Sequence, residues 1–408
     1  MKKYISILIC LGLISCGQIN YTTAQNDNAD EVDPSINLSE NAINEIFVFA
    51  TDYASSGQVY RAFYTDGETT LENSGLTLLG TEAKIKRYND LLYILHAGAG
   101  FNSISTDNLQ IVNPYYANTP FKTVSQFSTG NGTNPQDVII EDDKAFMSLF
   151  NPANDPNNVA ENGYPADVIE MSTTTGIITH RYSFHDFLED DGDRNAHAAN
   201  MIEVNDILYV CLQDLESNTF APTAPGKIGM IDVTNHSILG VITLESRNPY
   251  GLTANSEGTK IYITATHDYT YSGTYGGLEV VDIATKTTDL FIPDDLLEGY
   301  VERISMGNDH AFIIVSQYDL ETFSFQSKIM RFPADLEDIN DISEFKSYGT
   351  DIRAFMYQDD SLWVSYRVIS TTEGDSNANI KLFDVTTGEQ LGETLYPVVA
   401  GVSIAGND

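Results

Sequence analysis

Short runs of apolar residues alternating with polar ones recur along most of the chain, and seven of these runs carry an aromatic residue at the same position. Residues 92–95 (Leu-Tyr-Ile-Leu) and 261–264 (Ile-Tyr-Ile-Thr) are two of them. The seven aromatic residues lie 46 to 63 residues apart and are Phe47, Tyr93, Phe146, Tyr209, Tyr262, Phe312 and Trp363. One β-rich run per unit of this length is typical of a β-propeller. The pattern therefore predicts an all-β fold, a seven-bladed β-propeller over residues 45–408.

Each predicted blade consists of four antiparallel strands. In most units an alternating apolar stretch comes first and ends in a tight turn of Asn, Asp or Gly, such as Asn89-Asp90 or Asn205-Asp206. These residues tolerate the left-handed backbone that a two-residue hairpin turn requires. The aromatic strand follows the turn, and two further strands follow that one. The aromatic side chains are expected to pack between neighbouring blades, where burying each one contributes about 1.5–3 kcal/mol.

The first blade lacks an opening strand, because only a polar segment precedes Phe47. The last residues of the chain, 398–408, contain an alternating apolar stretch and an Asn-Asp pair, with no aromatic strand after them. We therefore predict that the first blade is closed by the C-terminal strand. This arrangement removes the two free sheet edges that an open ring would expose.

The N-terminus has the features of a targeting segment. Lys2 and Lys3 precede an apolar run over residues 5–14, which is about half the length that a membrane-spanning helix needs. Residues 1–15 are therefore predicted to be a signal peptide. The end of this segment, residues 13–17 (Leu-Ile-Ser-Cys-Gly), resembles a bacterial lipobox, and the resemblance implies lipidation of Cys16. The alternative is a plain secretory signal that contains a chance cysteine.

Residues 16–44 are predicted to form a flexible acidic tether that starts at the lipidated Cys16. The segment contains five acidic residues and no Lys or Arg, and it cannot bury enough apolar surface to fold alone. In lipoproteins of Gram-negative bacteria, an Asp directly after the lipidated cysteine favours retention in the inner membrane. Gly17 occupies that position here, so the resemblance implies a lipid anchor in the outer membrane of the bacterial cell envelope.

The composition is strongly acidic. The chain has 58 Asp and Glu against 21 Lys and Arg, which gives a formal net charge of −37. Such a charge repels nucleic acids and anionic lipids, so no nucleic acid is expected as a partner and contact with the membrane is expected only through the lipid anchor. Two interpretations stay open: a surface that keeps the protein soluble in salty surroundings, or a surface that binds cations or a basic protein.

Residues 248–287 resemble one repeat of the YVTN/YncE-like propellers, a family of seven-bladed β-propellers. The run Ile-Tyr-Ile-Thr-Ala at 261–265 stands in the position of the motif that names the family, with Ala in place of the final Asn, and Asn134-Pro135 opens a weaker copy. The resemblance implies the propeller fold. It leaves the function open, because these propellers include surface-layer, binding and secreted proteins.

No catalytic motif stands out, since Gly-x-Ser-x-Gly, His-Glu-x-x-His and phosphate-binding glycine-rich loops are missing. The seven His are scattered, and His180 and His185 would face opposite sides of a strand, which predicts surface or loop histidines. The densest acidic run contains Asp190, Asp191 and Asp193. Closely spaced carboxylates suit Ca²⁺, so this run is a candidate calcium site, and calcium is the one cofactor suggested. A solvated acidic loop is the alternative.

Four of the nine Arg lie between blades or at the start of an inner strand, where propeller connections converge on one mouth of the central channel. Arg at such a mouth can hold a carboxylate or phosphate through two hydrogen bonds. We interpret Arg194-Asn195 and Arg247-Asn248 as equivalent positions, with Asn134 as a third copy. The alternative is that each Arg pairs with a nearby acid such as Asp351 or Glu302. The predicted ligand-binding residues are Arg194, Asn195, Arg247, Asn248, Tyr250, Arg303, Arg353 and Asn134.

The sequence therefore predicts a lipid-anchored propeller of the cell envelope that acts as a non-catalytic binding module. Its ligand would be a protein, a glycan or a small anion, bound at the channel mouth or on the long polar loops, because such loops carry function in many folds. The alternative is an enzyme, a lactonase- or hydrolase-like propeller with a metal bound in the channel.

Overall fold

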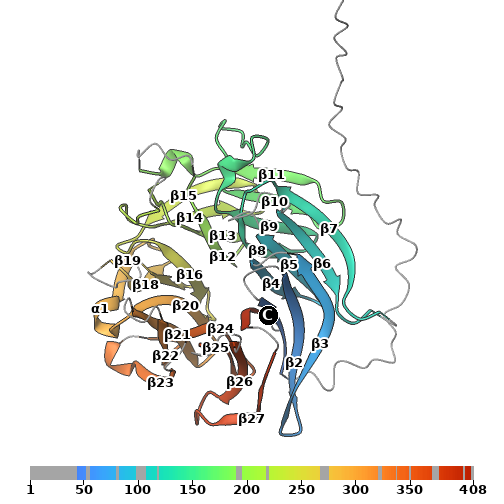
Figure 1. Cartoon of the computed structure of the whole chain (residues 1–408). Helices are drawn as coiled ribbons and strands as arrows, with labels where there is room; N and C mark the ends of the chain where they lie inside the picture. Colours follow the sequence, from blue (N-terminus) through green and yellow to red (C-terminus); the bar gives the residue numbers. More distant parts are fainter. Residues whose placement is uncertain are drawn as a thin grey trace, which may run out of the picture. The chain divides into compact units, whose positions relative to one another are not determined.

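The computed structural model describes residues 44–51, 56–79, 82–97, 107–116, 119–189, 195–216, 220–266, 275–319, 324–336, 338–348, 351–369, 376–397 and 400–405. These residues form seven four-stranded antiparallel sheets. Figure 1 shows the sheets arranged around a common centre. The prediction of a seven-bladed, all-β propeller is therefore confirmed.

We number the blades 1 to 7 along the chain, and within each blade the strands run from the innermost outward. The strands are: blade 1, β28 (Ala400–Ala405), β1 (Glu45–Thr51), β2 (Ser56–Thr65), β3 (Glu68–Leu79); blade 2, β4 (Glu82–Tyr88), β5 (Leu91–Ala97), β6 (Asp107–Asn113), β7 (Lys122–Gly130); blade 3, β8 (Pro135–Glu141), β9 (Lys144–Leu149), β10 (Val168–Ser172), β11 (Ile178–Tyr182); blade 4, β12 (Ala198–Val204), β13 (Ile207–Leu212), β14 (Lys227–Asp232), β15 (Ser237–Thr243); blade 5, β16 (Pro249–Ala254), β17 (Lys260–Ala265), β18 (Gly277–Asp282), β19 (Thr288–Pro293); blade 6, β20 (Tyr300–Met306), β21 (His310–Asp319), β22 (Ser324–Pro333), β23 (Ser343–Tyr348); blade 7, β24 (Asp351–Gln358), β25 (Ser361–Ile369), β26 (Ser376–Asp384), β27 (Gln390–Leu395).

Helical structure in the described residues is limited to four short turns. They are η1 (Pro152–Asn154), η2 (His185–Phe187), α1 (Asp294–Leu297) and η3 (Ile339–Asp341). None of the helices in the described part of the chain is long and apolar enough to cross a membrane. The predicted signal peptide, the lipidated Cys16 and all of the predicted tether except Asn44 lie outside the described residues, so these features stay predictions.

The C-terminal strand closes the first blade, as the sequence predicts. β28 pairs antiparallel with β1, and Ile404 lies opposite Val48. The Ser403 hydroxyl also accepts a hydrogen bond of 3.1 Å from the backbone N–H of Ile85 in blade 2. The two ends of the propeller domain therefore share one sheet, and the inner edge of β1 is paired with β28.

The hydrophobic core consists of seven clusters among the described residues, one at each junction between neighbouring blades. Phe146 of blade 3 packs with Leu208 of blade 4, and Trp363 of blade 7 packs with Val48 of blade 1. All seven recurring aromatic residues are buried. Their predicted packing between blades is confirmed. Cys211 is buried in such a cluster, and burial raises the pKa of its thiol.

Left-handed residues form the turns between first and second strands. Asn89, Asp142, Asn205 and Asp359 have φ between 48° and 54°, and Gly258 has φ of 63°. Asn, Asp and Gly adopt this conformation at the lowest cost. The turn residues that the sequence suggested therefore have the backbone that a tight hairpin requires.

Buried carboxylates hold the connections between blades. Asp107 is fully buried and accepts a hydrogen bond of 2.8 Å from the backbone N–H of Asn134. Asp167 accepts two such bonds in the next blade, from Phe184 (2.7 Å) and Ala196 (3.0 Å). Each bond satisfies an N–H that the loop would otherwise leave unpaired. Part of the large acidic content is therefore structural.

Candidate functional site in the central channel

Six of the seven inner strands carry a β-bulge or register shift near their start, and in β8, β16, β20 and β24 the single extra residue is a Gln, Tyr, Glu or Arg. In these four strands, the residue before the bulge and the residue after it face consecutive residues of the second strand, so the residue between them has no partner. A bulge bends the strand and re-aims the side chain of the extra residue, and bulges are common near functional sites. The extra residues are Gln136, Tyr250, Glu302 and Arg353.

The first contact across the channel joins Lys84 and Tyr250. Lys84 is on β4 and Tyr250 is on β16. In both directions around the ring, at least two other inner strands lie between β4 and β16. Nonetheless, Lys84 Nζ donates a hydrogen bond of 2.9 Å to the Tyr250 hydroxyl. Blades 2 and 5 therefore meet at the centre of the ring, and the charge of Lys84 lies inside the channel.

Arg303 adds a second cation at this point. Its guanidinium carbon lies 5.9 Å from the centroid of the Tyr250 ring, and the side chain is half-buried. Within the described segments, the Arg303 side chain makes no hydrogen bond and no ion pair within 4 Å, although its charge acts on Glu302 and Asp351. An Arg fork matches the geometry of a carboxylate or phosphate.

The other charged groups on this side of the channel are partly paired. Arg353 Nη2 lies 2.5 Å from Asp351 Oδ2, so this Arg is held by the acid beside it. Burial raises the pKa of Glu302, Asp351 adds to the effect, and Arg303 and Arg353 oppose it. The pKa of Tyr250 is shifted the other way, downward. Lys84 stabilises the phenolate, and this effect outweighs burial, which would raise the pKa.

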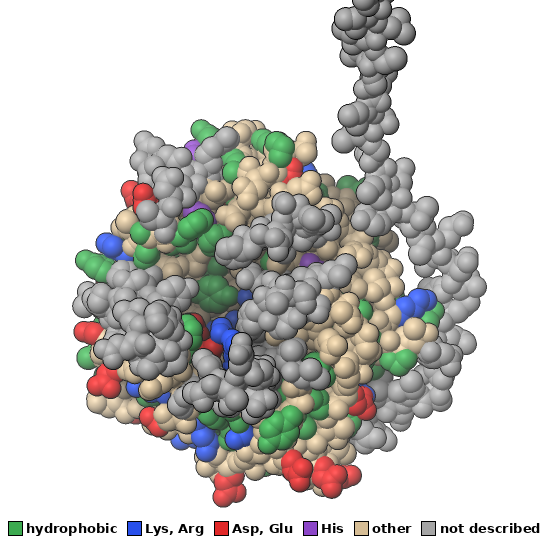
Figure 2. All heavy atoms as spheres, in the orientation of Figure 1, with side chains coloured by type: hydrophobic (Ala, Val, Ile, Leu, Met, Phe, Trp, Pro, Cys, Tyr) green, Lys and Arg blue, Asp and Glu red, His purple; other side chains and the backbone are tan. Residues whose placement is uncertain are grey.

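Positive charge therefore collects in the channel of a protein whose overall charge is strongly negative. Figure 2 shows Lys and Arg side chains near the centre of this face. Cations confined by low-dielectric walls attract anions more strongly than the same charges on an open surface. The arrangement is suited to binding a small anion, because Lys84 and Arg303 lie at the same tyrosine ring.

The predicted site residues fall into two groups. Tyr250, Arg303 and Arg353 come together in the channel, as described above. Arg247 lies on the loops, where its guanidinium donates to the Pro222 carbonyl (3.3 Å) and lies 4.0 Å from the Tyr275 ring centroid. Arg194 and the candidate calcium ligands Asp190, Asp191 and Asp193 lie outside the described residues. Binding by these residues stays a prediction.

The proposed equivalence of Asn195 and Asn248 is wrong by two residues. Asn134 and Asn248 directly precede their inner strands and have φ of 51° and 54°, and in blade 4 the residue in this place is His197, with φ of 49°. Asn195 instead accepts a hydrogen bond of 3.0 Å from the backbone N–H of Ala153. The error arose because the connection into β12 continues two residues further before the strand begins.

Two groups of residues escaped the sequence analysis. Lys84 lies on β4, which no Arg-Asn or Asn-Pro pair precedes, and only closure of the ring brings it to Tyr250. The sequence predicts His180 to be a surface or loop histidine; it is partly exposed on an outer strand, and it also lies beside His236 and the buried Glu170. No local sequence pattern links Glu170, His180 and His236, because these three residues come from two blades.

The fold and the channel define the class of the protein as a seven-bladed β-propeller with a cationic channel. No family model matches the chain, and no curated protein matches it. Among solved structures it resembles a proposed 6-phosphogluconolactonase from Bacteroides uniformis, with a TM-score of 0.58, 12% identity, and coverage of 88% of this chain and 98% of that one. A second proposed 6-phosphogluconolactonase, from Bacteroides fragilis, has a TM-score of 0.53 and 12% identity over 88% of this chain and 96% of that one. At this identity the likeness shows the fold alone.

Proposed function

We propose that the protein is an envelope-bound propeller that binds a small organic anion in its central channel. The observation that carries the proposal is the contact of Lys84 with Tyr250 across the ring, with Arg303 beside the same ring. Lys84 uses one of its three N–H donors on Tyr250, and Arg303 uses none on the described protein. A carboxylate or phosphate placed between them would receive charge-assisted hydrogen bonds from both.

The raised pKa of Glu302 supports an anion as the ligand. The pKa of Glu302 is raised, because its carboxyl is partly desolvated and lies near Asp351. A protonated carboxyl beside the site does not repel an anion and can donate a hydrogen bond to it. The site would therefore bind anions more tightly as the pH falls toward the acid range.

The experiment is calorimetric titration of the mature protein with 6-phosphogluconate, which carries both a carboxylate and a phosphate. Lys84→Gln and Arg303→Gln are each expected to weaken binding by about tenfold or more, because each removes a charged hydrogen bond. Lys286→Gln serves as the matched control, because it removes one positive charge from an exposed turn outside the channel. Equal affinity in all four proteins would contradict the proposal.

An enzyme is the second candidate, and one observation favours it. Tyr250 has a lowered pKa and Glu302 a raised pKa within one channel, and pairs of groups shifted in opposite directions often act as base and acid. Two of the structural neighbours are proposed 6-phosphogluconolactonases. We therefore propose hydrolysis of a phosphorylated sugar lactone as the reaction to test. A lactone hydrolysis rate above the rate in buffer alone, reduced in Glu302→Gln and in Tyr250→Phe, would establish an enzyme. A rate equal to that in buffer alone would favour the binding module.

We further propose that Cys16 anchors the propeller to the outer membrane. The support is the lipobox resemblance of residues 13–17 and the polar segment that follows it. In a Gram-negative host, Cys16→Ala is expected to abolish labelling with a fatty-acid analogue and to release the protein from the membrane fraction. Cys10→Ala is the control, and it should stay membrane-bound and labelled. Retained labelling of Cys16→Ala would overturn the proposal.

A further inference from the structure

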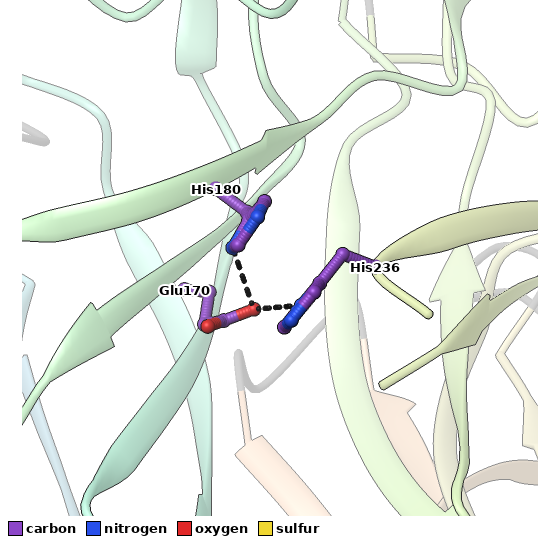
Figure 3. Close-up of side chains that lie close together, drawn as sticks. All are labelled: Glu170, His180 and His236. Atoms are coloured by element: carbon purple, nitrogen blue, oxygen red, sulfur yellow. Dashed lines mark hydrogen bonds and ion pairs between the residues drawn. The ribbon is translucent and has the colours of Figure 1, made fainter. Parts of the chain in front are cut away.

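A second cluster of chemically active side chains lies on the outer strands, between blades 3 and 4. Glu170 is on β10 and His180 is on β11, directly opposite each other in the antiparallel register. His236 comes from the turn between β14 and β15 of the next blade and has φ of 52°. Figure 3 shows both imidazoles beside the same carboxylate oxygen. The cluster is separate from the channel, because none of its strands is an inner strand.

The donor atoms converge closely. His180 Nδ1 lies 3.2 Å from Glu170 Oε2, and His236 Nδ1 lies 2.9 Å from the same oxygen. Three ligand atoms, one from each residue, all lie within 4.8 Å of one another. Zinc bonds of about 2.0–2.1 Å in a tetrahedron place neighbouring ligand atoms about 3.3 Å apart. Both nitrogen–oxygen distances are already close to that value.

The rings themselves must turn slightly to bind a metal. The two imidazoles are stacked with centroids 3.8 Å apart and planes 7° from parallel, so their in-plane lone pairs do not yet point at one spot. Both side chains are partly exposed, with 39% for His180 and 30% for His236. The freedom of exposed side chains permits this rotation, whereas the carboxylate between them is held in place.

Glu170 is the fixed part of the cluster. Its side chain is 2% exposed, Oε1 accepts a hydrogen bond of 2.8 Å from Thr179, and Oε2 accepts one of 3.0 Å from Tyr182. Burial acts to raise the pKa of Glu170, but these hydrogen bonds and the two His outweigh it and lower the pKa. Hydrogen bonds from neighbouring groups orient metal ligands in the same way in many sites.

The buried carboxylate has no permanent positive partner. Within the described segments, the only ion-pair partners of Glu170 are His180 and His236, and a His carries a positive charge only when it is protonated. A buried negative charge is costly unless a cation neutralises it. A bound divalent metal would supply that charge, and the two imidazoles would supply nitrogen ligands to it.

Solvent reaches the cluster through a cavity. Its volume is about 460 Å³, and it is lined by His180, Tyr182 and His236 together with Asn162. A metal ion can therefore enter without unfolding of a blade, and water can complete its coordination. Three protein ligands with an open fourth position are the arrangement found at accessible zinc sites.

We propose that Glu170, His180 and His236 form a binding site for a transition-metal dication of the Zn²⁺ class. Two imidazole nitrogens favour Zn²⁺, Co²⁺, Ni²⁺ or Cu²⁺ over Ca²⁺ and Mg²⁺, which prefer oxygen ligands. The site joins the outer strands of blade 3 to a turn of blade 4, so the metal would also link the two blades.

The test is titration of the mature protein with Zn²⁺ in the presence of excess Mg²⁺. The Mg²⁺ occupies the acidic surface, which would otherwise bind Zn²⁺ without specificity, but it does not displace Zn²⁺ from His. We expect one tight site per chain and a rise in melting temperature at one equivalent. Co²⁺ should give the visible absorption of a tetrahedral site.

His236→Asn is the decisive variant, because Asn tolerates the left-handed backbone at this turn and the fold should be kept. It should weaken Zn²⁺ binding by about tenfold or more, and His180→Asn should do the same. His310→Asn is the control, because this His lies in blade 6, and it should bind as the wild type does. Absence of a tight site in the wild type, or equal binding by His236→Asn and His310→Asn, would overturn the proposal.

Discussion

Single residues in the channel carry the chemistry of this propeller. Lys84 and Arg303 place positive charge around Tyr250, and Glu302 lies next to Arg303 at the bulge of β20. The same side chains on the outer surface would be screened by solvent and salt. In the channel Lys84 lowers the pKa of Tyr250 and burial raises the pKa of Glu302, so the chemistry of the site depends on burial as much as on residue type.

Glu302 should make stability depend on pH in a defined direction. Its pKa is raised by burial in the folded protein, so between the ordinary Glu pKa of about 4.3 and the higher folded value, the folded state holds more protons than the unfolded state. The free energy of unfolding then falls as pH rises through that window. Glu302→Gln stays neutral and escapes this loss. The free energy of unfolding of Glu302→Gln minus that of the wild type should therefore be larger at pH 7.5 than at pH 4.5.

Urea unfolding of both proteins at the two pH values measures this effect. Glu257→Gln, on an exposed turn, controls for the loss of one negative charge from the chain. A stability difference between Glu302→Gln and wild type that is the same at pH 4.5 and pH 7.5 would contradict the raised pKa.

The recurring aromatic residues should be the most sensitive core positions. Phe146 is fully buried and packs against blade 4, so Phe146→Ala should lower the free energy of unfolding by about 3–5 kcal/mol. Phe187→Ala removes the same ring from a position that is 38% exposed and should cost far less. Denaturant unfolding compares the two. A similar loss of unfolding free energy in both variants would show that Phe146 stabilises the blade junction no more than an exposed ring does.

At the scale of elements, closure and bulges decide what the blades can do. The β28–β1 pairing converts an open array of sheets into a ring. The bulges at Tyr250, Glu302 and Arg353 then give each of these residues a place outside the regular pairing of its inner strand. A regular strand would alternate its side chains between the two faces of the sheet, so the bulge changes which residues can meet across the channel.

Removal of β28 should open the ring. Truncation of residues 397–408 leaves the inner edge of β1 unpaired, and an exposed apolar edge strand promotes aggregation. We expect the truncated protein to aggregate and to lose its cooperative melting transition. Truncation of residues 406–408, which leaves β28 intact, is the control and should melt like the parent. Cooperative melting of the longer truncation at the parent temperature would show that blade 1 is stable with three strands.

At the scale of the whole molecule, the net charge of −37 acts against compactness, because like charges repel within the fold. The buried carboxylates Asp107 and Asp167 are part of the structure, but most acidic residues are not neutralised by the 21 basic ones. The positive channel is therefore a local exception inside a negative molecule.

Salt should have opposite effects on stability and on anion binding. Raising NaCl from about 10 to 100 mM shortens the Debye length from about 30 to about 10 Å, which screens repulsion between the acidic residues and should raise the melting temperature. The same screening should weaken binding of 6-phosphogluconate in the channel. Calorimetry at both salt concentrations measures both effects. A melting temperature that falls with added NaCl would contradict this account of the charge.

The sequence by itself determined the features that repeat locally. The spacing of Phe47, Tyr93 and their counterparts predicts seven blades, and the surplus strand at the C-terminus predicts the closure, because strand periodicity and turn chemistry depend on neighbours along the chain. Among the site residues, Tyr250, Arg303 and Arg353 could be predicted from their place at the start of inner strands.

Only the tertiary structure decided which residues meet. Lys84 and Tyr250 are 166 residues apart in the sequence, and His180 and His236 come from different blades. No periodic pattern links such residues, because their contact depends on the closure of the ring and on the stacking of one blade on the next. The sequence therefore specifies the number of blades, whereas the packing of those blades creates the cationic channel and the Glu170–His180–His236 cluster.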